Sequence, residues 1–132
     1  MNSWDIGADV AGYAWRVENP RAQVLLQHGY GEYAQRYVEQ YSQLIPKLNE
    51  NRIDVYAIDL PGHGNTKGTR GLVDLTQAVK LHLQARAQLP TDVPTVLFGH
   101  SLGGLITAGS VIRDRANIVA VILSSSAMQA PS

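Results

Sequence analysis

The sequence predicts an α/β protein with a mostly parallel sheet and helices on both faces. Short apolar runs typical of buried strands alternate along the chain with segments in which apolar residues recur at helical spacing. Parallel strands need crossover connections, so this alternation favours a parallel sheet. Three glycine-containing loops, at 27–32, 61–71 and 99–104, each follow a predicted strand. Because ligands bind beyond the carboxyl ends of such strands, we expect the three loops to meet at one edge.

The first half of the chain predicts strands at 10–17, 24–26 and 54–60, with a long helix between the second and the third. The first strand ends at a turn signal, Asn19-Pro20, and the third is apolar enough to be covered on both faces. Pro46 lies inside the helical pattern and lacks a backbone donor, so we expect a kink or an early end there. The apolar face of this helix comprises Tyr33, Ala34, Tyr37, Val38, Tyr41, Leu44, Ile45 and Leu48.

The second half predicts two more helices and two more strands. Asp74, followed three residues later by Gln77, resembles a capping box, and it opens a helix that runs toward Pro90. A strand at 93–98, a helix from Leu102 to about Arg113 and an apolar strand at 118–123 follow. These patterns place five strands and three helices, and the fold class leads us to expect about six strands and three helices in the whole chain.

Length and composition fit one soluble domain that acts on a small molecule. Among the 132 residues, 11 basic side chains balance 11 acidic ones, without a charge block that would favour nucleic acid. The chain has no cysteine and no secretory signal, and its longest apolar run, at 118–123, is too short to span a bilayer. We therefore expect a cytoplasmic protein with at most peripheral membrane contact. Neither a cofactor nor a metal is expected, because the histidines lack ligand spacing and the glycine loops lack nucleotide motifs.

Ser101 is the strongest candidate for a catalytic residue. It lies between an apolar strand and a helical pattern, with Gly99 and Gly103 two positions away on either side. A sharp strand-to-helix turn strains the serine backbone and brings neighbouring chain close, so small residues are needed at both positions. A serine that merely caps the following helix is the alternative. The sequence favours a nucleophile.

Three motifs resemble the α/β-hydrolase superfamily, in particular its monoacylglycerol lipase and lysophospholipase branch: HGYGE at 28–32, DLPGHG at 59–64 and FGHSLGG at 98–104. The resemblance runs from about Tyr13 to the end of the chain. It implies that Ser101 attacks an acyl carbonyl and that the backbone N–H groups of Tyr30 and Leu102 hold the oxyanion. It further implies substrate contacts from Gly29, Tyr30 and His100. Glu32, Asp59 and His63 are expected to stabilise the loops.

The acid and the base that such a serine needs are not apparent in the sequence. In this fold they follow the nucleophile, but no histidine follows Ser101, and Asp114 is expected to be solvated at a helix end. The resemblance implies a domain about twice as long, with a cap and a C-terminal half. We therefore expect residues 1–132 to be the N-terminal half of a single α/β-hydrolase domain. A second chain, arising from a nick, a split gene or expression of a fragment, would carry the catalytic Asp or Glu and the His.

The sequence thus predicts a serine ester hydrolase, close to monoacylglycerol lipases, lysophospholipases and carboxylesterases, that acts through an acyl-serine intermediate on an acyl ester substrate. Alone, the chain should be close to inactive. A noncatalytic ligand-binding remnant of the fold is one alternative, and an acyl transferase or perhydrolase using the same serine is another. Acyl chain length, head group, ester versus peptide preference and oligomeric state stay open.

Overall fold

The computed structural model describes residues 1–70 and 72–124, which form a six-stranded sheet in the order β1-β2-β4-β3-β5-β6. Strands β3, β4, β5 and β6 are mutually parallel, whereas β1 and β2 are antiparallel to their neighbours, so the predicted α/β class and mostly parallel sheet are confirmed. The elements are β1 (Asn2–Ser3), β2 (Gly12–Trp15), β3 (Ala22–Gln27), α1 (Arg36–Glu39), the 3₁₀ turn η1 (Tyr41–Gln43), α2 (Leu44–Glu50), β4 (Ile53–Ile58), α3 (Leu75–Ala87), β5 (Thr95–His100), α4 (Leu102–Arg113) and β6 (Ala120–Ser124).

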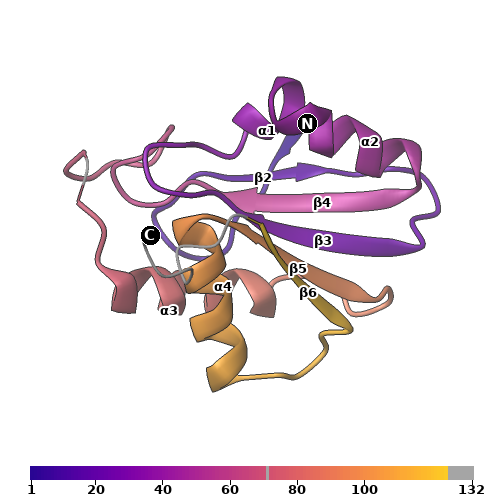
Figure 1. Ribbon diagram of the computed structural model, residues 1–132. Helices are drawn as coiled ribbons and strands as arrows, with labels where there is room; N and C mark the ends of the chain where they lie inside the picture. The colour runs from indigo at the N-terminus through magenta and orange to yellow at the C-terminus, as the bar shows by residue number, and fades with distance from the viewer. Residues whose placement is uncertain (71, 125–132) are drawn as a thin grey trace, which may run out of the picture.

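Helices cover both faces of the sheet, with α1 and α2 on one face and α3 and α4 on the other (Figure 1). Successive residues of a strand point to opposite faces, so each central strand supplies both cores. In β3, Leu25 packs with Leu81 and Ala85 of α3, whereas Leu26 packs with Ile45 of α2. All but the first residue of β4 are buried, which confirms the prediction of a strand covered on both faces.

The three central strands end level with one another. Gln27 at the end of β3 pairs with Ile58 at the end of β4 on one side and with Gly99 of β5 on the other. Parallel strands that end in register deliver their following loops to the same edge. The predicted convergence of the three glycine-containing loops is therefore confirmed.

The prediction of one long helix with a break at Pro46 is wrong. The chain instead turns at Tyr41, Ser42 and Gln43, which have φ angles of 53°, 59° and 56°. These left-handed conformations interrupt the helical path although none of the three residues is glycine. Pro46 lies in the first turn of α2, where backbone N–H groups have no intrahelical partner, so proline is tolerated there.

Smaller differences concern the two edges of the sheet. The first predicted strand, 10–17, is shortened to Gly12–Trp15, and a two-residue strand, β1, pairs outside it. The last predicted strand, 118–123, begins two residues later and ends at Ser124.

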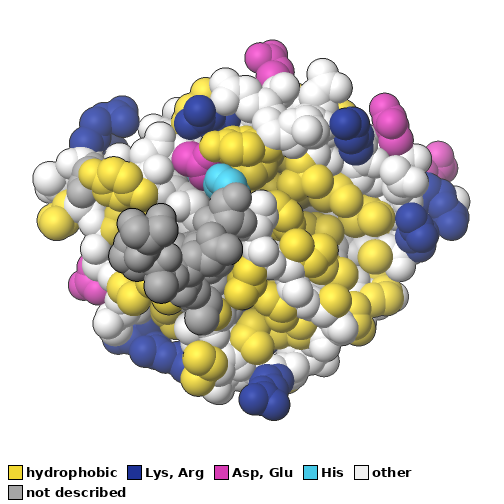
Figure 2. Space-filling view, in the orientation of Figure 1, with side chains coloured by type: hydrophobic (Ala, Val, Ile, Leu, Met, Phe, Trp, Pro, Cys, Tyr) yellow, Lys and Arg dark blue, Asp and Glu magenta, His cyan; other side chains and the backbone are white. Residues whose placement is uncertain are grey.

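Strand β6 is an exposed edge within the described part of the chain. Its side chains Val121, Ile122 and Leu123 are 38%, 50% and 41% exposed, and Val119, just before the strand, is 67% exposed. Figure 2 shows hydrophobic side chains gathered on the side of the molecule that carries β5 and β6. This apolar edge is a surface on which another polypeptide can pack.

Candidate active site

Ser101 sits in a sharp turn between the end of β5 and the start of α4, with φ 56° and ψ −123°. Its side chain makes no capping hydrogen bond to the helix, so the role of simple helix cap is not observed. A Cβ on Gly99 would collide with the carbonyl oxygen of Gly103, and a Cβ on Gly103 would collide with that of Gln27. Both glycines are therefore required by close backbone approach, as predicted, and the strained serine is held at the carboxyl end of the sheet.

The loop after β3 packs directly against this serine. A Cβ built on Gly29 would lie 3.1 Å from the Cβ of Ser101 and 2.9 Å from the carbonyl oxygen of His100. Leu102, the first residue of α4, directs its backbone N–H toward the helix N-terminus, where donors lack intrahelical acceptors. The structure thus brings together the loop containing Gly29 and Tyr30 with Ser101 and Leu102, four of the residues predicted for the site.

Glu32 holds the first loop in place, as expected. Its buried carboxylate accepts hydrogen bonds from the backbone N–H of Gly29 (2.8 Å) and the hydroxyl of Tyr37 (2.9 Å) on Oε1, and from Tyr41 on Oε2. Burial and, next, the charge of Glu32 raise the pKa of Tyr37. The ring of Tyr41 stacks on Tyr37 and lies 4.9 Å from the ring of His100. The sequence placed these tyrosines only on the apolar face of a helix, because apolar spacing does not indicate the partner of a hydroxyl group.

Asp59 ties the second loop to the first. Its Oδ1 accepts from the backbone N–H of Ala34 (2.8 Å), and its Oδ2 accepts from the hydroxyl of Tyr13 (2.6 Å) and the backbone N–H of Asn65 (3.0 Å). Burial, followed by the hydrogen bond to Asp59, raises the pKa of Tyr13 to about 12. The expected bonding of loop amides by this carboxylate is confirmed, whereas the contribution of Tyr13 was not foreseen.

Two histidines join the same loops. His28 Nε2 accepts from the backbone N–H of Leu60 (3.0 Å) and its Nδ1 lies 2.7 Å from the carbonyl oxygen of Gly29. His63 Nε2 accepts from the backbone N–H of Gly31 (3.0 Å), and its Nδ1 lies 3.0 Å from the carbonyl oxygen of Pro61. Burial lowers the pKa of His28, which favours the neutral ring that this bonding requires. Both rings are therefore engaged in loop structure, as predicted for His63.

The remaining histidines do not act on the serine either. His100 Nδ1 lies 3.3 Å from Ser124 Oγ, and His82 is fully buried on α3. Among the described residues, no hydrogen bond joins a histidine to Ser101 Oγ. Asp114 follows α4, where its Oδ1 accepts from the backbone N–H of Ala116 (2.8 Å), so it is a helix-end residue as expected.

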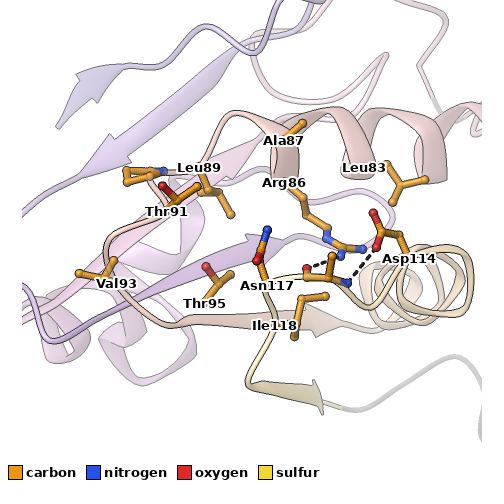
Figure 3. A pocket seen from close by; sticks show the side chains of 12 residues that line it. Leu83, Arg86, Ala87, Leu89, Thr91, Val93, Thr95, Asp114, Asn117 and Ile118 are labelled. Atoms are coloured by element: carbon orange, nitrogen blue, oxygen red, sulfur yellow. Dashed lines mark hydrogen bonds between the residues drawn. The ribbon is translucent and has the colours of Figure 1, made fainter.

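Two cavities differ in their relation to this site. A cleft of about 570 Å³ opens between the first and second loops and is lined by residues that include Tyr30, Tyr33, His63 and Arg70. A smaller cavity of about 160 Å³ lies beneath the opposite end of the sheet, near Arg86 and Asn117 (Figure 3). There the Arg86 guanidinium donates hydrogen bonds to the carbonyl oxygens of Ser110 and Ala116. These bonds hold α3 against the end of α4.

Two further features of residues 1–70 and 72–124 bear on the class of site. No three His, Asp or Glu side chains in this part of the chain lie close enough to hold a metal ion. No helix there has the length and apolar character needed to cross a membrane.

The parallel sheet, the strained serine at the end of β5 and the loop against it define the class of α/β hydrolases, and solved structures agree with this assignment. The crystal structure of Paleococcus ferrophilus monoacylglycerol lipase matches with a TM-score of 0.74 and 32% identity, over 95% of this chain and 48% of that one. A soluble variant of Saccharomyces cerevisiae monoglyceride lipase, in complex with a substrate analogue, matches with a TM-score of 0.70 and 26% identity, over 95% of this chain and 44% of that one.

The chain belongs to the family described as serine aminopeptidase, S33, whose model matches residues 18–132. It is 33% identical to phospholipase YtpA of Bacillus subtilis over 86% of this chain and 43% of the relative. It is 34% identical to monoacylglycerol lipase of Mycolicibacterium smegmatis over 85% of this chain and 40% of the relative. The matched part thus spans less than half the length of these relatives, which are single longer chains.

Proposed function

We propose that this chain supplies the nucleophile and the oxyanion hole of a serine ester hydrolase. The observation that carries the proposal is the strained backbone of Ser101, directed out of the end of β5 with the Gly29 loop packed against its Cβ. Relatives named as monoacylglycerol lipases and a phospholipase favour an acyl ester as the substrate. Tyr30 and Leu102 are the proposed backbone donors, and Gly29, Tyr30 and His100 are the proposed substrate contacts.

In the proposed reaction, Ser101 Oγ attacks the ester carbonyl carbon and gives its proton to a histidine. The carbonyl oxygen becomes an oxyanion that the N–H groups of Tyr30 and Leu102 stabilise, and each such donor contributes about 3 kcal/mol in related sites. Collapse breaks the bond to the alcohol oxygen, which takes the proton and leaves. Water then attacks the acyl-serine, passes a proton to the same histidine, and releases the carboxylic acid while Ser101 recovers its hydrogen.

We further propose that the histidine and its acidic partner come from a C-terminal half that lies outside these 132 residues. The support is that no described histidine is hydrogen-bonded to Ser101 Oγ, since His28, His63 and His100 bond other groups and His82 is fully buried, and that the relatives are longer. That half is either a continuation of the polypeptide or, as the sequence led us to expect, a second chain. We likewise propose that residues 1–132 form the N-terminal half of one α/β-hydrolase domain.

A fluorophosphonate probe tests the proposal, because it labels only a serine whose hydroxyl is activated. The native protein, with every polypeptide that copurifies with it, is treated with the probe, and the modified peptide is mapped by mass spectrometry. Labelling at Ser101, abolished by Ser101→Ala, is expected. Labelling elsewhere, or none in a preparation that contains both halves, would contradict the assignment. Product analysis with water and alcohol acceptors then separates hydrolysis from acyl transfer.

A noncatalytic binding module is the second candidate. It is favoured by one observation, namely that no described histidine bonds to Ser101 while the cleft between the first two loops is open. In that case the probe does not react, whereas ligand binding to the cleft persists in Ser101→Ala.

A further inference from the structure

The chain between α1 and α2 holds three consecutive residues in a left-handed backbone conformation, Tyr41, Ser42 and Gln43. Residues other than glycine are strained there, and such strain persists only where surrounding contacts hold it. Burial does not account for the run, because Ser42 and Gln43 are exposed and Tyr41 is 38% exposed. Backbone strain of this kind is concentrated at functional sites. Here the side chain that reaches the candidate active site is that of Tyr41.

The hydroxyl of Tyr41 bonds to the carboxylate that anchors the first loop. It donates to Oε2 of Glu32, whose Oε1 accepts from the backbone N–H of Gly29 at 2.8 Å. Glu32 is 7% exposed, and a carboxylate so far from water depends on protein donors to hold it in place. The Tyr41 hydroxyl therefore helps to fix the loop that carries Tyr30, the proposed backbone donor to the oxyanion.

The ring of Tyr41 contacts the other side of the site. Its centroid lies 4.9 Å from that of His100, with 55° between the two planes, which is contact distance for an aromatic pair. Nδ1 of the same histidine lies 3.3 Å from Ser124 Oγ at the end of β6. The His100 ring, one residue before Ser101, is thus restrained by packing on Tyr41 and by a polar contact with Ser124.

Tyr41 is itself held firmly. Its ring stacks on that of Tyr37, with centroids 4.6 Å apart and 22° between the planes, and Tyr37 is only 1% exposed. The Arg36 guanidinium carbon lies 5.6 Å from the centroid of Tyr41, within range of a cation–π interaction. A half-exposed side chain fixed in this way forms a rigid link between Glu32 and His100.

We propose that Tyr41 is a positioning residue that couples the first loop to the turn at Ser101. Its hydroxyl aligns the loop that carries Tyr30, and its ring orients His100, the proposed substrate contact. The inference rests on the proposed function and extends it to a residue outside the three sequence motifs. Tyr41 acts through Glu32 and His100, so the contributions of its hydroxyl and of its ring are separable.

Kinetics of the native assembly, with every polypeptide that copurifies with it, test the proposal on 4-nitrophenyl butyrate. Tyr41→Phe keeps the ring and is expected to lower kcat about tenfold and to leave KM within about twofold, because the loop donor acts in the transition state. Tyr41→Leu removes the ring as well and should also raise KM about fivefold, because it releases His100. Ser42→Gly is the control. It relieves the backbone strain and keeps the Tyr41 side chain, so it should change neither value by more than about twofold.

Hydrogen exchange followed by mass spectrometry gives a readout that does not depend on turnover. Peptides covering residues 28–34 are expected to exchange faster in Tyr41→Phe than in the parent protein, because the Gly29 N–H bonds to the carboxylate that the hydroxyl holds. Peptides of α3 should be unchanged, and Ser42→Gly should match the parent in both regions. The urea midpoint of Tyr41→Phe should stay close to that of the parent, since the residue is half-exposed.

Several outcomes would overturn the proposal. One is an unchanged kcat in Tyr41→Phe, and another is a loss that Ser42→Gly reproduces. Faster exchange that extends over α3 would indicate general destabilisation and a merely structural role. Equal KM values for Tyr41→Phe and Tyr41→Leu would remove His100 from the assignment. If the parent protein does not cleave the ester and the fluorophosphonate probe leaves Ser101 unlabelled, while exchange at 28–34 still depends on the hydroxyl, the proposed function fails and the link from Tyr41 to the first loop stands.

Discussion

Gly29 and Ser101 are in contact across two loops, so closely that a Cβ on the glycine would lie 3.1 Å from the Cβ of the serine. The same added atom would lie 2.9 Å from the carbonyl oxygen of His100 and 3.0 Å from Glu32 Oε1. These neighbours leave the first loop no room to accept a side chain without moving. The position of the loop relative to the serine is thus set by the absence of a side chain at residue 29.

Gly29→Ala is expected to lower kcat/KM of the assembled enzyme roughly 10²-fold, because the displaced loop misaligns one backbone donor of the oxyanion hole. Gly31→Ala is the matched control. A Cβ there would meet no described atom within 4 Å, but φ is 74°, so the substitution should cost about 1 kcal/mol of stability through backbone strain and leave activity within a few fold. Ester hydrolysis and urea unfolding of both variants check this. Equal activity losses in the two would argue against a specific contact between loop and serine.

Gly103→Ala is expected to destabilise the fold by about 3 kcal/mol, because the new Cβ would collide with the backbone carbonyl of Gln27 and lie 2.6 Å from that of His28. Backbone cannot rotate away as a side chain can. At Gly109 of the same helix, the described atoms near an added Cβ belong to the flexible side chain of Val79, at 3.0 Å, so Gly109→Ala should be tolerated far better. Denaturant unfolding of the two variants gives the comparison, and similar midpoints would contradict it.

His82 is expected to make the protein less stable in acid. The ring is fully buried, and neither nitrogen has a hydrogen-bond partner among the described residues. Burial, followed by the charge of Arg86, lowers the pKa of His82 to about 3. The unfolded chain, with an ordinary histidine pKa near 6.5, therefore binds the proton more tightly. The contribution of His82 to stability is complete above about pH 6.5 and is lost as the pH falls toward 3.

His82→Phe removes this titration while keeping the ring volume. Between about pH 7 and about pH 4.5, its free energy of unfolding should fall by roughly 2–3 kcal/mol less than that of the parent protein. Urea unfolding at the two pH values measures the difference, and carboxylates and His28, which titrate in both proteins, cancel. Parallel pH profiles would show that the ring is accessible to protons in the native state.

The exposed edge at β6 is expected to make the 132-residue chain self-associate when no other polypeptide covers it. Ile122→Lys, which places a charge on the edge, should increase the monomer fraction seen by light scattering after size exclusion. Ile112→Lys, at an 80% exposed position on α4, is the control and should do so less. A compact monomer of the parent chain with no companion polypeptide would contradict the expectation.

The sequence was sufficient for those features that depend on local pattern. Buried strands appear as apolar runs, and the turn at Ser101 requires glycines on both sides, so the central sheet and the elbow could be predicted. The break at Tyr41–Gln43 could not, because none of its left-handed residues is glycine, and apolar spacing does not reveal side-chain bonds such as that from Tyr41 to Glu32. The same limit applies to Tyr13, whose partner Asp59 is brought to it only by pairing of β2 with β4.

Three backbone N–H groups, of Leu60, Gly31 and Ala34, donate to His28, His63 and Asp59 respectively, and these bonds have a mechanical consequence. They connect the two loops into a single unit beyond the end of the sheet, so a shift of one loop moves the other. A ligand that widens the cleft would therefore displace the segment carrying Gly29, and with it the contact between Gly29 and Ser101. Occupancy of the cleft and the position of the loop beside Ser101 are therefore coupled through one rigid-body displacement.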